Sequence, residues 1–221
     1  MIPVLTIDGP SGVGKGTVAN FVASTLSWNL LDSGAIYRAF ALAASKRNIT
    51  IKDTEALLSL AANLNLKFES DLENKKLSVY LDHIEVSSEL RTEKTAELAS
   101  KFAMIGSLRE SLLVRQQRFK ELPGLVADGR DMGTVVFKDA PFKVFLTANI
   151  EERAKRRLKQ LQDKGIAGNI LHTLDEVKKR DERDASRKPS PLKPAKDALI
   201  IDTSNLAINE VVTKGMARVK V

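Results

Sequence analysis

Nine residues near the start of the chain have the types and spacing of a loop that binds phosphate. The segment reads Gly9-Pro-Ser-Gly-Val-Gly-Lys-Gly-Thr17. Its glycines allow the backbone to wrap closely around an anion, and the loop N–H groups and the start of the following helix favour negative charge. Lys15 can reach the outer phosphates of a nucleotide, and a hydroxyl at the helix start can hold Mg²⁺. The usual pattern has Ser or Thr directly after the lysine, whereas here Gly16 stands there and Thr17 follows.

The residues on either side of this loop also fit. An apolar run from Ile2 to Ile7 precedes it, and Val18, Val22 and Leu26 follow at helical spacing. A chance match in a glycine-rich turn need not have a strand before it and a helix after it. The two flanks therefore predict a phosphate-binding loop between a strand and a helix.

A second candidate is Asp128, which ends the apolar segment Leu125–Ala127. An acid at the end of a strand can act at the catalytic site of a phosphate-binding protein or hold its metal through water. The pair Asp128-Gly129 is also a common turn, which needs no ligand. Because the loop at 9–17 is present, we favour the functional interpretation.

A third candidate is the segment Asp32-Ser-Gly-Ala-Ile-Tyr-Arg38. We expect Ser33 to cap a helix whose buried stripe includes Ile36 and Phe40. Tyr37 and Arg38 fall off that stripe, so they could face a cleft and bind a base and a phosphate.

A fourth candidate is a group of charged residues near the end of the chain, namely Arg180, Arg183, Asp184 and Arg187. Their spacings of three, four and seven predict one helix face. They could form a surface ladder of ion pairs, which would stabilise the fold little. They could instead bind a transferring phosphoryl group, because its transfer depends mostly on positioning and charge neutralisation. Arg153, Arg156 and Arg157 repeat the arrangement upstream, and the sequence alone leaves both interpretations open.

The elements that must position these residues alternate between apolar strands and helical segments. Strand-like runs recur at 4–7, 125–127, 142–147 and 199–202, which predicts a mostly parallel sheet covered by helices. Residues 66–86 instead alternate as short half-buried strands with polar turns near 71–75 and 82–83, which predicts a small antiparallel sheet. Capping-box patterns predict helix starts at Ser107 and Asn149.

The composition limits the classes of function. A chain of 221 residues can hold one α/β domain with an insertion. It contains no cysteine, has no signal-like start and has no apolar run of the ~20 residues that span a bilayer, so we expect a cytoplasmic protein. The net charge of +7 suits either a nucleic acid or small phosphorylated ligands. Aromatic residues are only 5% and there is no basic tail, so we favour the small ligands.

With these residues identified, the chain resembles the bacterial cytidylate kinases (CMP/dCMP kinases) of the nucleoside monophosphate kinase superfamily. Four segments in this order carry the resemblance: 7–17, 31–38, 128–137 and 180–184. Gly16 after the lysine is what this superfamily shows. The resemblance implies a three-layer α/β/α phosphate-loop core with a mostly parallel sheet at 1–65 and 91–221. It also implies an inserted monophosphate-binding subdomain with a small antiparallel sheet at 66–90, and a helical lid at about 150–168.

The resemblance further implies transfer of the γ-phosphoryl group of ATP to CMP or dCMP, with Mg²⁺ as cofactor. The implied catalytic residues are Lys15, Asp128, Arg130 and Arg157. The residues implied for ATP are Gly9, Pro10, Ser11, Gly12, Val13, Gly14, Lys15, Gly16 and Thr17. Thr17 and, through water, Asp128 are implied for the metal.

The residues implied for the monophosphate are Ser33, Tyr37, Arg38, Ser100, Arg109, Arg130, Asp131, Arg180, Asp184 and Arg187. Among them, Arg38, Arg109 and Arg130 are implied for the acceptor phosphate, and Arg180 and Asp184 for the sugar. Ser100, Asp131 and Arg187 are implied for the cytosine edge, whose amino group can donate a hydrogen bond to a carboxylate. Arg153 and Arg157 are implied to close with the lid.

We therefore expect nucleotides as the partners of a monomer, without nucleic acid or membrane. The alternatives are a kinase for another small molecule or pyrimidine nucleotide on the same core, and a basic nucleic-acid binder regulated by nucleotides.

Overall fold

The chain adopts an α/β fold, which a computed structural model describes over residues 2–71, 76–163, 165–188, 190–217 and 219. It divides into two compact units. The first comprises Met1–Leu30 and Lys120–Val221, and the second comprises Leu31–Phe119. Residues 72–75, in the segment predicted as an insertion and in its first predicted turn, lie outside the described part, as do residue 164 of the predicted lid and Pro189.

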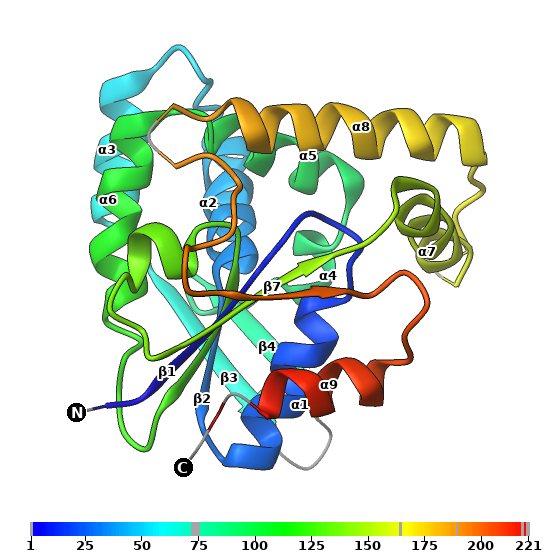
Figure 1. Cartoon of the computed structure of the whole chain (residues 1–221). Coiled ribbons are helices and arrows are strands. Elements are labelled where there is room, and N and C mark those ends of the chain that lie inside the picture. Colours follow the sequence, from blue (N-terminus) through cyan, green and yellow to red (C-terminus); the bar gives the residue numbers. More distant parts are fainter. Residues whose placement is uncertain (1, 72–75, 164, 189, 218, 220–221) are drawn as a thin grey trace. The chain divides into compact units, whose positions relative to one another are not determined.

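A five-stranded sheet contains the strands predicted to be parallel. Its strands are β1 (Val4–Asp8), β2 (Asn29–Asp32), β6 (Leu125–Gly129), β7 (Phe142–Thr147) and β8 (Leu199–Asp202). Their order is β2-β6-β1-β7-β8, and β1 pairs in parallel with both β6 and β7. The strand order therefore runs in opposite directions from β1, with β6 on one side and β7 on the other. In such sheets ligands bind beyond the carboxyl ends of the strands where the order reverses. The phosphate loop begins there (Figure 1).

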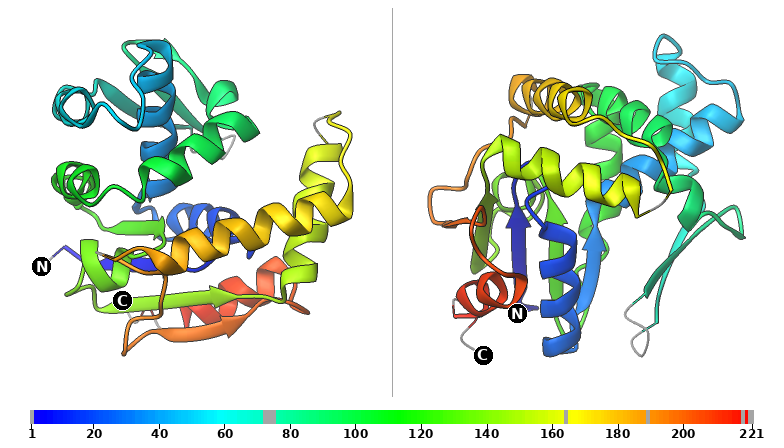
Figure 2. Two further views of the ribbon diagram at one scale, coloured as in Figure 1. Left: turned by 90° about the horizontal axis from the view of Figure 1, so that it is seen from above. Right: turned by 90° about the vertical axis from the view of Figure 1, so that its right-hand side faces the viewer.

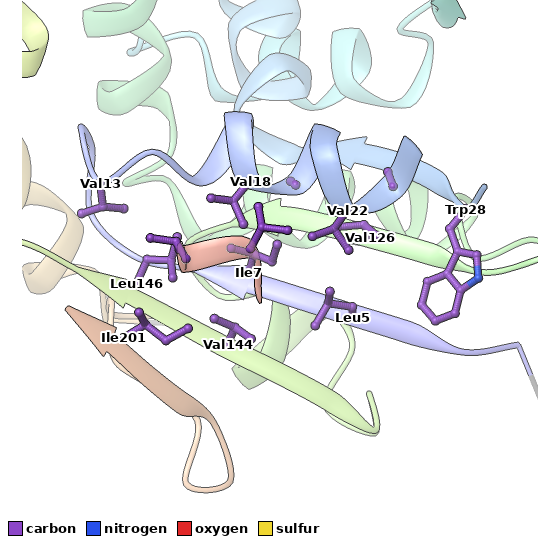
Figure 3. Close-up of a cluster of buried hydrophobic side chains, with 14 residues drawn as sticks. Leu5, Ile7, Val13, Val18, Val22, Trp28, Val126, Val144, Leu146 and Ile201 are labelled. Carbon is purple, nitrogen blue, oxygen red and sulfur yellow. The ribbon is translucent and has the colours of Figure 1, made fainter. Parts of the chain in front are cut away.

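Helices of the first unit complete the core around this sheet. They are α1 (Lys15–Leu26), α7 (Ile150–Gln162), α8 (Ile170–Ser186), α9 (Ile208–Met216) and the short π-helix η1 (Met132–Val136). Val18 and Val22 of α1 face Leu5 and Ile7 of β1 in one buried cluster (Figure 3). This packing fixes the start of α1, and hence Lys15, at the end of β1. The helices α7 and α8 are consecutive and pack against each other (Figure 2).

The second unit is built around α2 (Ser33–Lys46), most of whose residues are buried. Its other elements are α3 (Thr54–Ala62), β3 (Leu66–Asp71), β4 (Lys76–Leu81), β5 (Ile84–Glu85), α4 (Ser87–Leu90), α5 (Glu93–Phe102) and α6 (Gly106–Gln117). The antiparallel order β3-β4-β5 confirms the predicted small sheet. Phe40 of α2 meets Phe102 of α5 edge to face, with ring centroids 5.4 Å apart.

Two of the predicted helix starts were wrong. The N-cap of α2 is Asp32, whose carboxylate accepts from the Ala35 N–H (2.9 Å), and Ser33 is the first helical residue. The helix α6 begins at Gly106 with Ile105 before it, so Ser107 lies inside the first turn. Asn149 does stand at the N-cap of α7, although its side chain makes no capping hydrogen bond there. For α2, the neighbouring polar residues Asp32 and Ser33 compete for one cap position, whereas α6 begins after Ile105 without a side-chain cap. Helix ends are in any case defined only to within one or two residues.

Among the described residues, no helix combines the length and apolar character needed to cross a membrane.

Candidate nucleotide-binding and phosphoryl-transfer site

The phosphate loop joins β1 to α1, and Lys15 is the first residue of the helix. The lysine is buried, with 6% of its surface exposed, and its Nζ donates to the Pro10 carbonyl (2.7 Å). Burial, and next the charge of Arg130, lower the pKa of Lys15 to about 7, although Asp128 opposes the change. Positive charges that raise one another's energy are stabilised by an anion. The loop therefore has the electrostatics of a phosphate site.

Asp128, at the end of β6, lies beside the phosphate loop. Its Oδ2 is 3.5 Å from the position that a Cβ on Gly16 would occupy, and the residue is buried. Thr17, which follows Gly16 in the sequence, is exposed and carries a hydroxyl. A carboxylate and a hydroxyl are hard oxygen donors of the kind Mg²⁺ prefers, and Mg²⁺ commonly takes few protein ligands beside phosphates and water. These residues fit a magnesium ion bound mainly by the nucleotide.

This fit does not extend to a metal site made by protein alone. Within the part of the chain that the structure describes, no group of three or more Asp, Glu or His residues is placed to hold a metal ion.

Asp184 joins two of the candidate arginines. Arg130 Nε donates to its Oδ2 (2.8 Å), and Arg187 Nη2 donates to its Oδ1. Only 1% of the Asp184 side chain is exposed. Burial alone would raise the pKa of Asp184, but Arg130, Arg187 and Arg180 outweigh it and hold that pKa at about 2. The carboxylate therefore stays charged and binds both guanidinium groups. This cluster is buried, so it is not a surface ladder of ion pairs.

Arg187 shows a difference from the predicted helix face. The helix α8 ends at Ser186, and Arg187 follows with extended backbone angles. Its guanidinium still returns to Asp184, three residues earlier. The spacing of three residues correctly placed Asp184 and Arg187 together, although Arg187 lies just beyond the end of α8.

The three arginines of α7 have different surroundings. Arg153 is buried; it binds Asp181 through two hydrogen bonds (3.0 and 2.6 Å) and donates to the Ser11 carbonyl (3.3 Å). A Cβ on Gly12 would lie 3.0 Å from Arg153 Cβ, so a glycine allows this close approach. Arg153 thus contacts the phosphate loop itself and links it to α8.

Arg156 and Arg157 differ from Arg153 in their partners. Arg156 donates to the side chain and carbonyl of Thr203 after β8 (3.1 and 2.5 Å), and Thr203 in turn donates to the Val13 carbonyl (3.2 Å). Arg157 donates to Gln160 (3.2 Å), an exposed contact within its own helix. Of the bonds described for these three arginines, the one from Arg157 to Gln160 is exposed, whereas those of Arg153 and Arg156 are partly buried.

The remaining candidates lie in the second unit. The Ser33 hydroxyl donates to Oε1 of the buried Gln116 (2.7 Å), whose Nε2 donates to the Leu112 carbonyl (3.3 Å). The Arg109 guanidinium lies over the Tyr37 ring, 5.4 Å from its centroid. Tyr37 is 7% exposed and therefore buried, whereas the sequence predicted that it could face a cleft.

The candidates thus form two groups. The first group lies in the first unit. There Asp184 is hydrogen-bonded to Arg130 and Arg187. The pKa of Lys15 is affected by Arg130, Asp128, Arg180 and Asp184, and that of Asp184 by Arg130, Arg187 and Arg180. Asp131 lies beside them in sequence and is 3% exposed. The second unit holds Ser33, Tyr37, Arg38, Ser100 and Arg109; Ser100 is 5% exposed and Arg38 is half-buried.

Three site residues were missed from the sequence. Gln116 continues the buried positions Leu108 and Leu112 of α6, so a polar residue on an apolar stripe was the available signal. Asp8 is an acid at the end of a fully buried strand, which was a similar signal. Asp181 had none, because only the packing of α7 against α8 shows that it pairs with Arg153.

The fold and this geometry define the class of the protein. A parallel sheet whose central strand runs through a glycine-rich loop into a helix beginning at a buried lysine is the arrangement of the phosphate-loop nucleotide-binding proteins.

More particularly, the chain belongs to the cytidylate kinase family, whose family model matches residues 5–221. It is 52% identical to the cytidylate kinase of Shewanella denitrificans over 99% of this chain and 96% of that protein. It is also 52% identical to the cytidylate kinase of Klebsiella pneumoniae, over 97% and 94% respectively. Among solved structures, a gluconokinase from Sinorhizobium meliloti is similar at 13% identity, with a TM-score of 0.48 over 98% of this chain and 90% of that chain.

Proposed function

We propose that the protein transfers the γ-phosphoryl group of ATP to CMP or dCMP, giving ADP and CDP or dCDP. The observation that carries the proposal is the buried set of charges beside the phosphate loop, in which Lys15 and the Arg130–Asp184 pair influence one another's pKa values. Membership in the cytidylate kinase family supports the choice of CMP as acceptor.

The proposed reaction needs no nucleophile from the protein, because the acceptor is an oxygen of the CMP phosphate. Its main barrier is the repulsion between two polyanions, and phosphoryl transfer is catalysed mostly by positioning and charge neutralisation. Residues 9–17 bind the ATP phosphates, and Lys15 binds the transferring group. Arg130 and Arg157 neutralise charge that develops during transfer. Thr17 and, through water, Asp128 would hold Mg²⁺ together with the nucleotide, and the ion would supply further charge neutralisation.

The remaining roles follow the family's motif. Arg38, Arg109 and Arg130 bind the acceptor phosphate, and Ser33 and Tyr37 line its site. Arg180 and Asp184 bind the sugar, while Ser100, Asp131 and Arg187 bind the cytosine edge. We further propose that residues 66–90 form the inserted monophosphate-binding subdomain, and that residues 150–168 act as a lid that excludes water. The protein is proposed to act as a monomer in the cytoplasm, where ATP and nucleoside monophosphates are available.

The experiment that tests this proposal is a panel of acceptors with coupled detection of ADP. CMP and dCMP are expected to be phosphorylated at least tenfold more efficiently than UMP, AMP or shikimate. Equal kcat/KM values for CMP and UMP would contradict the roles given to the cytosine edge. A preference for shikimate would favour the alternative of another small-molecule kinase on this core.

Variants at the charge cluster test the assigned site. Lys15→Ala and Arg130→Ala are expected to lower kcat/KM at least a hundredfold, because removing one preorganised charged donor costs about 3 kcal/mol of transition-state stabilisation. Lys179→Ala is a matched control, because Lys179 forms an exposed ion pair with Asp175. Near-normal turnover by either site variant would refute its role.

A further inference from the structure

Asp8 is a buried acid with no role in the proposed reaction. It is the last residue of β1, directly before the phosphate loop, and only 4% of it is exposed. Its Oδ1 accepts from the Met132 N–H and its Oδ2 from the Gly133 N–H, each at 2.8 Å. One carboxylate therefore links the end of β1 to the start of η1.

The start of η1 needs this acceptor. The first N–H groups of a helix have no partner within the helix, and a carboxylate is a favourable partner for them. In η1 the Asp131 carbonyl accepts from Val135 (2.8 Å), whereas the N–H groups of Met132 and Gly133 point to Asp8. With both oxygens used, Asp8 fixes the direction in which the chain leaves Asp131.

The approach between Asp8 and η1 is close. A Cβ on Gly133 would lie 2.8 Å from Thr6 Oγ1 and 3.4 Å from Asp8 Oδ2. Any side chain at position 133 would push η1 away from β1. Glycine at this position is therefore part of the same contact.

The linked segment carries site residues at its start. Arg130 and Asp131 directly precede Met132, and Arg130 binds Asp184. Asp131 and Lys15 also act electrostatically on Asp8. A change at Asp8 would therefore move groups assigned to the acceptor without removing any of them.

We propose that Asp8 is a positioning residue, which holds Arg130 and Asp131 in register with the phosphate loop for the monophosphate acceptor. This inference rests on the proposed function. The Asp8 carboxylate touches neither nucleotide and acts through the backbone of Met132 and Gly133.

The test is the kinetics of Asp8→Asn with each substrate varied in turn. The amide offers one oxygen, and its NH₂ group faces an N–H donor, so one of the two hydrogen bonds is lost. The KM for CMP is expected to rise about tenfold, which corresponds to about 1.4 kcal/mol, or one hydrogen bond. The KM for ATP is expected to change less than threefold. An equal rise in both KM values, or a change in neither, would overturn the proposal.

Two further variants separate positioning from loss of folding. Gly133→Ala disturbs the same contact from the other side and leaves Asp8 intact, so it should reproduce the rise in KM for CMP. Asp197→Asn makes the same chemical change at an exposed acid, which pairs with Lys143 near this contact, and it should leave both KM values unchanged. A normal KM for CMP in folded Gly133→Ala would contradict the proposal even if Asp8→Asn did not fold.

The pH profile is a second readout. Burial raises the pKa of Asp8 to about 7, against the hydrogen bonds from Gly133 and Met132. The charged groups that face it are Lys15 of α1, Arg130 and Asp131 after β6, and Lys143 of β7. Protonation removes an acceptor, so the KM of the wild type for CMP should rise between pH 8 and 6 more than that of Asp8→Asn. The variant retains the other groups and uses the same substrate, so parallel profiles would refute the role.

If CMP is not a substrate at all, the acceptor panel fails for the wild type as well. If only the positioning role is wrong, the wild type phosphorylates CMP and Asp8→Asn does so with an unchanged KM.

Discussion

Two buried carboxylates of the first unit have pKa values that move in opposite directions. Asp184 lies between arginines, and its pKa falls to about 2. Asp8 accepts from the backbone N–H groups of Met132 and Gly133, and burial raises its pKa to about 7. Because one residue type gives both results, the charge state of these acids follows from their neighbours.

This contrast predicts opposite dependences of stability on pH. The pKa of Asp8 is higher in the folded than in the unfolded state, so its contribution is present below about pH 3.8 and lost as the pH rises through 7. Wild-type protein should therefore lose up to about 4 kcal/mol of unfolding free energy, relative to Asp8→Asn, between pH 4 and 8. Urea unfolding without nucleotide at several pH values measures this difference.

Asp184→Asn is the matched control for that experiment. The folded pKa of Asp184 is depressed, so its contribution is lost only as the pH falls from about 3.8 through 2. Its deficit relative to the wild type should stay constant between pH 4 and 8. A constant difference for Asp8→Asn as well would show that Asp8 does not titrate in this range.

At the scale of elements, an ion pair between the helices α7 and α8 also reaches the phosphate loop. Arg153 of α7 binds Asp181 of α8 and the Ser11 carbonyl. The family resemblance gives Arg153 a place in a moving lid. In the structure Arg153 links α7 to α8 and to the phosphate loop, and Arg157 lies one turn further along α7.

Breaking this pair should affect both stability and ATP binding. Asp181→Asn is expected to cost about 1–3 kcal/mol of unfolding free energy, less than for a fully buried pair, because 26% of the Asp181 side chain is exposed. The KM for ATP should rise, because Arg153 also orients the loop at Ser11. Chemical unfolding and steady-state kinetics measure the two effects.

The control for this variant lies on the same helix. Asp175→Asn removes an exposed ion pair with Lys179, and such pairs stabilise a fold little. It should change neither property measurably. Equal effects of the two substitutions would mean that the Arg153–Asp181 ion pair contributes no more to stability and ATP binding than an exposed pair does.

For the whole molecule, the net charge of +7 could suggest a nucleic-acid partner. Three arginines of the first unit, Arg130, Arg153 and Arg187, are instead bound to acids, and their side chains are largely buried. Charge held in this way cannot release counterions from a polyanion.

The protein is therefore expected to bind RNA and DNA weakly. At about 150 mM salt the Kd for a single-stranded 20-mer should be weaker than about 100 µM, while CMP is still phosphorylated. Fluorescence anisotropy over a salt series measures this. A Kd below 1 µM with a steep salt dependence would instead favour the nucleic-acid binder.

Much of the fold and part of the site could be predicted from the sequence. The phosphate loop, the parallel strands and the small antiparallel sheet are local patterns of glycine, lysine and apolar spacing, and each segment carries its own signal. The pairing of Asp184 with Arg187 was also local, since the two residues are three positions apart.

The remaining contacts required the tertiary structure. Asp8 and Met132 are 124 residues apart, Ser33 and Gln116 are 83 apart, and Arg153 and Asp181 are 28 apart on separate helices. No periodicity connects such positions, and only the packing of strands and helices brings them within hydrogen-bond distance. The sequence by itself thus determined which residues could bind phosphate. The tertiary structure decided which of them are held by partners, because burial and the identity of the nearest charge set both geometry and protonation.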